Sequence, residues 1–567
     1  MKTSDVAYAP RPGPRLLGRP AFAGCLAALL MWWPALTPSL IPRTWATQAL
    51  IGGVALALAY GFGTLAGYLF RRLLPSTGSA KSGPWPVFGI ACALIVPSGA
   101  GFWMRWQNGQ RDLMGMEVLS VFDAVLTTTM SLLLATLLVL AGRAIGRALT
   151  ASTHVGRRML PDTSLGPLAG PAVLGLGALL LGYGAWLGFT AYAHMSHGAL
   201  NATTDEGATQ PYSPALSGSS SSLIPWNTLG RWGRNFVSSA TTLEDLRMFY
   251  GPGAELAQPV RVYVGLTSAG SVKQRAELAV RELDRAGGFD REVLAVWVPT
   301  GTGWMIPEAA EALETLHRGD TAIVAVQYSS LPSLISVFVD PGAEIETASA
   351  LFAAVHRHWS NLPADRRPRL VLFGKSLGTA GVEALFAGPD ASTSIGRIVA
   401  RTDGILLVGA KHSNPIHAQV TRGRDPGSPV WQPLFENGRS VRFLSRDADR
   451  PASDSSWRMP RIAYLQHPSD PVPFWGIEAL WRPPEWMDRP RGFDVPDAAG
   501  WYPIATALHA VNDLLFQLST PPGFGHVYST DYARGWASVL PPPGWNPADT
   551  ERLERFVHAE GAAETEL

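Results

Sequence analysis

Three residues that lie far apart in the chain have the side-chain types that nucleophilic catalysis needs: Ser376, Asp470 and His526. Ser376 is the centre of "GKSLG", a G-x-S-x-G pattern that directly follows the apolar run "LVLF". A serine hydroxyl is a weak nucleophile until a base removes its proton, and the imidazole base needs a carboxylate that holds its tautomer. We therefore predict that Ser376 attacks a carbonyl carbon, that His526 carries the proton, and that Asp470 orients His526.

Four other side chains in the second half compete for the acid and base roles: Asp447, Asp449, His467 and His509. The two aspartates lie in the Arg-rich "SRDADR", which is typical of a solvated surface, whereas Asp470 closely follows the strand-like "RIAYLQH". One of the histidines precedes the acid in the chain and the other falls within a helical pattern, so both are predicted to be structural. His526 lies in the Gly- and Pro-rich "PPGFGHVYSTDY", a loop that can return over a sheet.

Attack on a carbonyl also requires N–H donors for the negative oxygen that forms. One donor is normally the N–H after the nucleophile, here that of Leu377, and the other comes from a loop after an earlier strand. The glycine-rich "PTGTGW" at 299–304 follows such a strand, and its backbone can approach an oxyanion closely. Gly301, Thr302 and Gly303 are the candidates, with Thr302 and Gly303 preferred and the choice between them open.

From about residue 260, strand-like and helix-like patterns alternate. Apolar, β-branched runs of strand length include "VRVYVGL", "EVLAVWVP", "TAIVAVQY", "RLVLFGKS", "GILLVGA" and "RIAYLQH". Runs of this kind separated by amphipathic helical patterns predict a mostly parallel sheet with helices on both faces. Catalytic groups in such sheets gather at the carboxyl ends of the strands, where Ser376 and Asp470 fall.

The first part of the chain is of a different kind. Only 16% of the 567 residues are charged, and five long apolar runs lie at about 20–41, 49–70, 85–104, 119–142 and 172–193. Each is close to the ~20 residues that a helix needs to cross a bilayer. We therefore predict an α-helical transmembrane domain with five spans. The net charge of +1 suggests no nucleic-acid partner, and Cys25 and Cys92 lie in apolar runs that suggest no disulfide or thiolate metal site.

The distribution of Lys and Arg predicts the orientation in a plasma membrane. The N-terminus and the loops after the second and fourth spans carry eleven basic residues, against three in the other two loops. Basic loops stay in the cytoplasm. The N-terminus is therefore predicted to be cytoplasmic, and an odd number of spans places everything after residue 193 outside the cytoplasm.

These patterns divide the chain into a transmembrane domain at 1–195, a small and polar linker at 196–222, and a catalytic domain at 223–567. The segment 473–504, between the presumed acid and base, is unusually rich in aromatic residues. Two interpretations of this segment are equally supported. It is either a small satellite core or a cap that walls an apolar acyl pocket or touches lipid.

The chain resembles the membrane-anchored bacterial α/β-hydrolases, the family called Abhydrolase 9, whose catalytic domain follows its own membrane domain. The matching stretches span about 36–540 and are "LTPSLIPR", "SLIPWNTLGR", "VRVYVGLTSA", "PTGTGW", "GDTAIVAVQYS", "FGKSLG", "YLQHPSDPV" and "GHVY". The resemblance assigns the triad to Ser376, Asp470 and His526. This chain departs from the family pattern at Lys375, because the family usually has an acid at that position. We expect the Lys375 side chain to point away from the elbow and to alter only the local charge.

The resemblance implies an esterase or lipase that acts on a lipid or another hydrophobic ester, including aminoacylated lipids. The expected partners are this substrate and the bilayer, and no metal or cofactor is predicted. Two alternatives remain open from the residues. An acyltransferase would use the same triad, and a non-catalytic membrane scaffold would keep only the fold as a binding surface.

Overall fold

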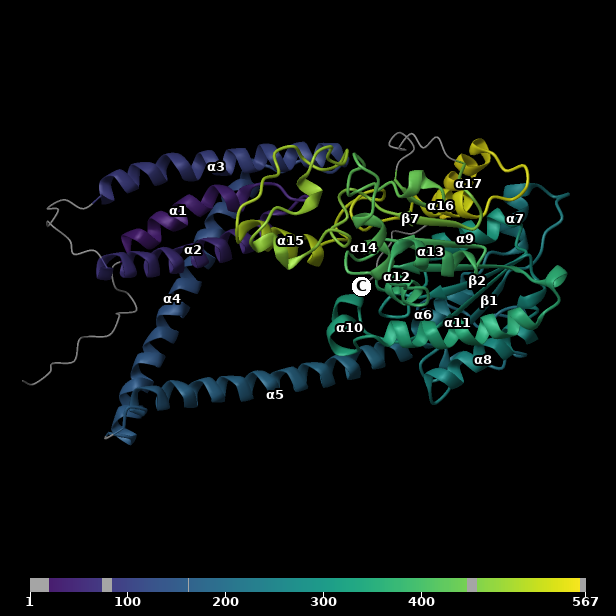
Figure 1. Cartoon of the computed structure of the whole chain (residues 1–567), viewed down its shortest axis with the longest axis horizontal. Helices are drawn as coiled ribbons and strands as arrows, with labels where there is room; N and C mark the ends of the chain where they lie inside the picture. The colour runs from purple at the N-terminus through teal and green to yellow at the C-terminus, as the bar shows by residue number, and fades with distance from the viewer. Residues whose placement is uncertain (1–19, 74–83, 162, 446–455, 561–567) are drawn as a thin grey trace, which may run out of the picture. The chain divides into compact units, whose positions relative to one another are not determined.

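The computed structural model describes residues 20–73, 84–161, 163–445 and 456–560 (Figure 1). Its contacts divide the chain into two compact units. The helical unit comprises the described parts of Met1–Phe189 together with Glu478–Pro483 and Ala498–Asn512. The sheet unit comprises the described parts of Thr190–Ile477, Pro484–Asp497 and Asp513–Leu567. Of the basic residues used for the orientation, Lys2, Arg11, Arg15, Arg19 and Lys81 lie outside the described residues.

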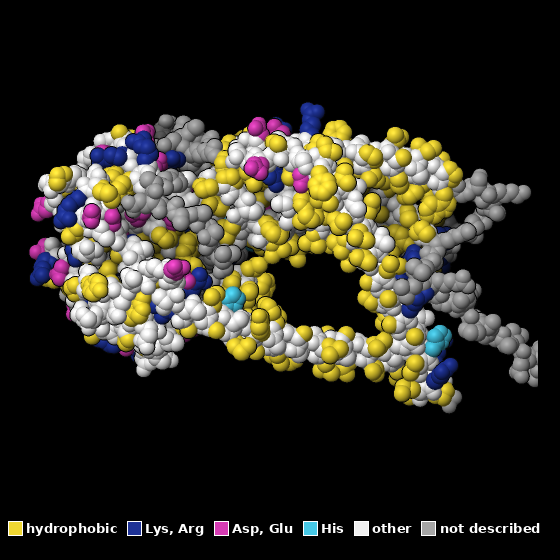
Figure 2. All heavy atoms as spheres, turned by 180° about the vertical axis from the view of Figure 1, so that it is seen from behind, with side chains coloured by type: hydrophobic (Ala, Val, Ile, Leu, Met, Phe, Trp, Pro, Cys, Tyr) yellow, Lys and Arg dark blue, Asp and Glu magenta, His cyan; other side chains and the backbone are white. Residues whose placement is uncertain are grey.

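The helical unit contains the long apolar helices of the chain. Its helices are α1 (Phe22–Leu36), α2 (Trp45–Leu73), α3 (Trp85–Leu113), α4 (Val121–Met159) and most of α5 (Gly166–Ala202). Among the described residues, α2, α3, α4 and α5 are long and apolar enough to cross a membrane. Figure 2 shows apolar side chains gathered over this unit.

The first predicted span is corrected by the structure. The run at about 20–41 forms a helix of only 15 residues, which ends at Leu36. At about 1.5 Å per residue this helix is roughly 22 Å long, short of the ~30 Å hydrocarbon core. It ends because Thr37 is extended and precedes Pro38, and a proline disfavours helical geometry in the residue before it. The residues that the structure describes therefore contain four helices of spanning length and not five.

The chain after α1 stays inside the helical unit. Leu36–Arg43 is buried, and side chains of α3 bind its backbone. Gln110 Nε2 donates to the carbonyls of Ser39 (2.9 Å) and Leu40 (3.0 Å), and Gln107 Oε1 accepts from the N–H of Arg43 at 2.6 Å. These hydrogen bonds satisfy the backbone of a buried segment that has no regular structure of its own.

The predicted α/β architecture is confirmed in the sheet unit. Among the described residues, seven parallel strands form one sheet in the order β1-β3-β2-β4-β5-β7-β6. They are β1 (Val260–Val264), β2 (Val293–Val298), β3 (Thr321–Val326), β4 (Arg369–Lys375), β5 (Gly404–Val408), β6 (Val441–Leu444) and β7 (Arg461–Leu465). The central strands are buried on both faces, as continuous apolar runs require.

Helices cover both faces of this sheet (Figure 1). One group, α8 (Val272–Arg285), α11 (Ala343–Asn361) and α12 (Leu377–Ala384), contacts β1 to β4. A second group contacts β3, β5 and β7 through α9 (Pro307–Leu316) and α16 (Tyr532–Val539), with α17 (Pro547–Glu560) packed on both helices. The remaining α-helices of the sheet unit are α6 (Gly230–Ser238), α7 (Leu243–Tyr250), α10 (Ser333–Val339), α13 (Ala391–Val399) and α14 (Pro415–Arg422). Most of α15 (Ala505–Leu515) belongs to the helical unit.

The segment predicted as a linker, 196–222, is packed against the sheet unit. Its first residues belong to α5, which continues to Ala202. Farther along, the N–H of Ser217 donates to the Arg261 carbonyl at 3.0 Å, and the N–H of Arg261 donates to the Ala215 carbonyl at 3.2 Å. Small side chains let this segment approach β1, and it pairs with the exposed edge that β1 would otherwise present.

The aromatic segment between the presumed acid and base is shared between the two units. Pro484–Asp497 belongs to the sheet unit, where Ser469 Oγ donates to the Asp494 carboxylate. Glu478–Pro483 and Ala498–Asn512 belong to the helical unit, where Trp501 Nε1 donates to the Ala479 carbonyl at 2.8 Å. Along the predicted cap at 473–504, successive stretches thus belong alternately to the sheet unit and to the helical unit.

Candidate active site

Ser376 stands on a sharp turn between β4 and α12. Its φ of 51° and ψ of −119° lie outside the regions that side-chain-bearing residues normally adopt, at a cost on the order of 1–3 kcal/mol. The flanking glycines make the turn possible. A Cβ at Gly378 would lie 2.3 Å from the Val298 carbonyl oxygen, and one at Gly374 would lie 2.7 Å from the Gly378 carbonyl oxygen. The turn is held by the N–H of Ser376, which donates to the Val408 carbonyl at 2.8 Å.

The structure brings Asp470 and His526 together although 56 residues separate them. His526 Nδ1 lies 2.8 Å from Asp470 Oδ2, and both side chains are buried. The carboxylate also accepts from the Tyr528 hydroxyl at 2.6 Å and from the N–H of Val472 at 2.9 Å. His526 Nε2 is buried and has no hydrogen-bond partner among the described residues. The imidazole is therefore held by Nδ1, and its second nitrogen is left for chemistry.

The acid loop and the base loop are joined by further hydrogen bonds. Ser469 Oγ accepts from the N–H of Gly525 at 2.8 Å, and His467 Nδ1 lies 2.9 Å from the Gly525 carbonyl. Gly525 has a φ of 53°, and a Cβ there would lie 2.5 Å from Thr520 Oγ1. Glycine at this position lets the tight turn that carries His526 close against the acid loop.

Gly409 places the base beside the nucleophile turn. It directly follows β5, which pairs with β4 on one side and β7 on the other. A Cβ at Gly409 would lie 2.2 Å from His526 Cε1 and 3.1 Å from Asp470 Oδ2. The residue before it, Val408, binds the Ser376 N–H. The imidazole therefore occupies the space that a side chain at 409 would fill, at the carboxyl ends of three adjacent strands.

The predicted oxyanion loop lies next to the elbow because β2 pairs directly with β4. Within this loop the N–H of Gly301 donates to Ser333 Oγ (3.0 Å) and the N–H of Gly303 donates to the Thr300 carbonyl (2.9 Å). The N–H of Thr302 has no acceptor among the described residues. The first N–H of α12, that of Leu377, has no intrahelical acceptor either. Thr302 and Leu377 thus offer the two available donors.

Two side chains hold the oxyanion loop by its carbonyl groups. Tyr263 Oη donates to the Gly303 carbonyl at 2.7 Å, and Gln327 Nε2 donates to the Thr302 carbonyl at 2.9 Å. Gln327 Nε2 also donates to Asn201 Oδ1 at 3.0 Å, on the last turn of α5. One amide thus links the loop to the end of a long apolar helix.

A model described as the alpha/beta-hydrolase family matches residues 260–553, more than half of the chain. The chain belongs to the alpha/beta-hydrolase family. A second model, described as the N-terminus of this family, matches residues 36–240. The family predicted from the sequence motifs is therefore confirmed. No curated protein and no solved structure matches the chain.

Lys375, the residue at which this family member departs from the expected acid, is buried with 2% of its surface exposed. Its Nζ lies 5.3 Å from the centroid of the Trp304 ring, at the end of the oxyanion loop. A desolvated cation over an indole face gains about 2 kcal/mol, which offsets part of the cost of burial. The charge at 375 is thus sequestered next to the oxyanion loop.

The other candidates for the acid and base occupy different places. Asp447 and Asp449 lie outside the described residues. His509 belongs to the helical unit, where its Nε2 lies 3.1 Å from the Ala35 carbonyl. His467 lies beside the Asp470–His526 pair, because its ring stacks on Tyr528 with centroids 4.1 Å apart and Tyr528 binds Asp470.

Sequence reasoning missed three residues of this candidate site: Gly409, Ser469 and Tyr528. Ser469 lies in "YLQHPSDPV" and Tyr528 in "GHVY", two of the stretches that carry the family resemblance, but neither stretch indicates the hydrogen bonds that these side chains make. Gly409 directly follows a buried strand, where glycine often marks the close approach of another group.

Substitution of Gly409 by alanine is expected to lower kcat/KM by about 10²-fold, because the new methyl group displaces the imidazole and small displacements of a catalytic group have effects of this size. The matched control is Gly396→Ala, on an exposed face of α13 with open space around it. The measurement is hydrolysis of a p-nitrophenyl ester by the purified full chain. Equal activity of the two variants would contradict the placement of His526.

A second buried pair, His467 and Asp531, lies next to the candidate site, and its two groups have pKa values shifted in opposite directions. Both ring nitrogens of His467 face oxygen atoms, since Nε2 lies 3.2 Å from Asp531 Oδ2 and Nδ1 faces the Gly525 carbonyl. Burial opposes the charged ring, but the Asp531 carboxylate and the Gly525 carbonyl outweigh burial and raise the pKa of His467. For Asp531, burial is likewise outweighed by His467, and the pKa of the carboxyl is lowered.

Replacement of His467 by glutamine is therefore expected to cost about 1.5–3 kcal/mol of unfolding free energy at pH 6. A raised histidine pKa adds stability that is complete below the unfolded pKa of about 6.5 and is lost as pH rises through the folded pKa. The difference between wild type and variant should shrink from pH 6 to pH 9. Urea unfolding of the full chain at the two pH values measures it, and a constant difference would contradict an ionised pair.

Proposed function

We propose that the chain is a membrane-anchored serine hydrolase that cleaves a lipid or another hydrophobic ester. The observation that carries the proposal is the His526–Asp470 pair, whose buried Nε2 has no partner, beside a serine on a strained elbow. Membership of the alpha/beta-hydrolase family supports hydrolase chemistry in general terms.

In the proposed mechanism, Ser376 Oγ bonds to the ester carbonyl carbon while His526 Nε2 takes the hydroxyl proton. The carbonyl oxygen becomes an oxyanion that accepts hydrogen bonds from the N–H groups of Leu377 and Thr302. The C–O bond then breaks, and the alcohol leaves with the proton from His526. Water attacks the acyl carbon while His526 Nε2 takes one of its protons, and His526 then gives this proton to Ser376 Oγ as the acyl C–O bond breaks and the carboxylic acid leaves.

A membrane substrate is supported by the attachment of α5 to the sheet unit. Arg234 Nη2 donates to the carbonyls of Ala202 (2.9 Å) and Asn201 (3.2 Å), and a cation at this end of a helix also interacts favourably with the helix dipole. The last turn of this apolar helix reaches the oxyanion loop through Gln327. An ester that enters from a bilayer around α5 would meet the site close to the end of that helix.

We also propose that the N-terminus is cytoplasmic and that the catalytic unit lies outside the plasma membrane. The orientation follows the distribution of basic residues in the loops. It takes the short helix α1, with the buried residues 37–43 after it, as a crossing in addition to the four helices of spanning length. Alkaline phosphatase fused after residue 567 is expected to be active. This orientation would be contradicted if the phosphatase fusion were inactive and a green fluorescent protein fused at the same position were fluorescent.

The test of the catalytic proposal is a fluorophosphonate probe, which reacts with activated serines. The purified full chain should be labelled, Ser376→Ala should not, and Ser392→Ala, an exposed position on α13, should react like the wild type. Absence of labelling, or equal labelling of Ser376→Ala, would overturn the proposal. Comparison of the lipids of a deletion strain with those of a Ser376→Ala strain would then identify the substrate.

A further inference from the structure

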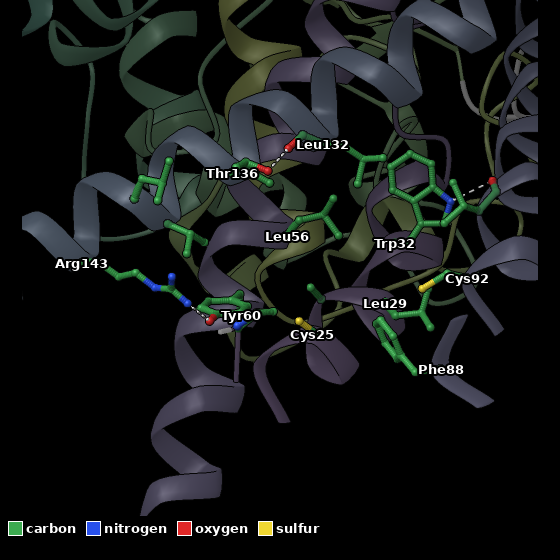
Figure 3. Close-up of a pocket in the computed structure, with 16 residues that line it drawn as sticks. Cys25, Leu29, Trp32, Leu56, Tyr60, Phe88, Cys92, Leu132, Thr136 and Arg143 are labelled. Carbon is green, nitrogen blue, oxygen red and sulfur yellow. Dashed lines mark hydrogen bonds between the residues drawn. The ribbon is translucent and has the colours of Figure 1, made fainter. Parts of the chain in front are cut away.

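The helical unit contains a cavity of about 380 Å³ that no catalytic role explains. Sixteen residues from α1 to α4 and the start of the described chain line it (Figure 3). Leu29, Leu56 and Phe88 are typical of this lining, which among the described residues includes no Asp or Glu and one charged side chain, Arg143. We call it the helical-unit cavity.

The polar groups in the body of this cavity are already satisfied by the backbone. Thr136 Oγ1 donates to the Leu132 carbonyl at 2.7 Å, and Trp32 Nε1 donates to the Val96 carbonyl at 3.3 Å (Figure 3). The lining therefore offers an apolar molecule close packing and offers water few hydrogen bonds. A lining of this kind favours an apolar occupant over water.

One end of the cavity is different, because Tyr60 and Arg143 meet there (Figure 3). Tyr60 Oη accepts from Arg143 Nη2 at 2.8 Å and from the N–H of Ala21 at 3.1 Å. These bonds use the acceptor capacity of the hydroxyl oxygen, and its own proton has no acceptor among the described residues. A guanidinium and a hydroxyl donor side by side suit an anionic oxygen.

We propose that the helical-unit cavity holds one acyl chain of an anionic phospholipid, whose phosphate binds at Tyr60 and Arg143. From Leu132 to Arg143 the cavity follows twelve residues of α4, an axial rise of about 16 Å, which suits a single extended chain. Arg143 begins the cluster of basic residues that is predicted to face the cytoplasm, where anionic lipids are recognised by basic pockets between helices. The inference rests on membrane insertion of α1 to α4 and is independent of catalysis.

Native mass spectrometry of the delipidated full chain in detergent tests the charge selectivity. Phosphatidylglycerol should bind in preference to phosphatidylcholine of the same chains, with one lipid per protein. Arg143→Gln should weaken phosphatidylglycerol binding about tenfold, the effect of one charge-assisted contact. Arg147→Gln, one turn farther along α4, is the matched control and should keep the preference. Equal binding of the two lipids by the wild type would overturn the proposal.

Two further measurements test the apolar body. Ala135→Phe should fill the cavity and abolish binding of both lipids, whereas Ala141→Phe on an exposed face of α4 should not. Cys25 and Cys92 are the chain's two cysteines and both line the cavity, so phosphatidylglycerol should slow their reaction with a membrane-permeant maleimide in the unmodified protein. Unchanged labelling rates, or protection by oleate and not by phosphatidylglycerol, would overturn the proposal. Ser376→Ala should bind lipid normally, which separates this test from that of catalysis.

Discussion

Replacement of Ser376 by alanine is expected to lower kcat/KM for a p-nitrophenyl ester by about 10⁶-fold, the loss that follows removal of the nucleophile of a serine triad. The His526→Ala variant should lose about as much. The kcat/KM of the double variant should fall no further than that of either single variant, because neither side chain contributes to catalysis when the other is missing. Hydrolysis by the purified full chain, with unfolding midpoints as a check on folding, measures all three.

Substitutions around Asp470 should have graded effects. Asp470→Asn should cost about 10⁴-fold, because the wrong tautomer of His526 is then stabilised. Tyr528→Phe removes one of three hydrogen bonds to the carboxylate and should cost about tenfold. The Ser376 and His526 variants decide whether these two side chains act as a unit. They do not if the double variant loses the sum of the two single losses, or if either single variant keeps activity within tenfold of the wild type.

The central strands could be predicted from the sequence because burial on both faces makes them continuous apolar runs. The observed bounds of β1, β2, β3 and β4 differ from the predicted runs by two residues or fewer at each end. The edge strand β6 was missed because it has only four residues and includes the half-buried Arg442. A short strand with one polar position resembles a loop until its partner, β7, is known.

The site was only partly predictable. Ser376, Asp470 and His526 follow from a motif and from chain order, but Ser469 and Tyr528 act through hydrogen bonds between loops that are distant in sequence. No local pattern encodes such contacts. The choice of Thr302 among three candidates likewise depends on which N–H groups the fold has already used. The division of the aromatic segment between the two units could not be predicted either, because aromatic side chains pack equally well in a helical unit and in a sheet unit.

The largest effect on stability is expected at a buried ion pair on the edge strand β1. Arg261 and Glu314 are both fully buried and make two parallel hydrogen bonds, Nε to Oε1 at 2.7 Å and Nη2 to Oε2 at 2.8 Å. Arg261 Nη1 also donates to the Phe236 carbonyl at 2.6 Å, and Glu314 accepts from the N–H of Thr241 at 3.3 Å. The pair thus ties β1 to α9 and to the chain after α6.

Arg261→Met is expected to lower the free energy of unfolding by about 3–5 kcal/mol, because the Glu314 carboxylate then stays buried without its cation. Addition of Glu314→Leu should restore much of this loss, since no uncompensated charge remains. Arg489→Met, at the exposed pair with Asp497, is the control and should cost no more than about 1 kcal/mol. Urea unfolding of the full chain measures the series. If the double variant lost the sum of the two single losses, desolvation of a lone charge would not be the cause.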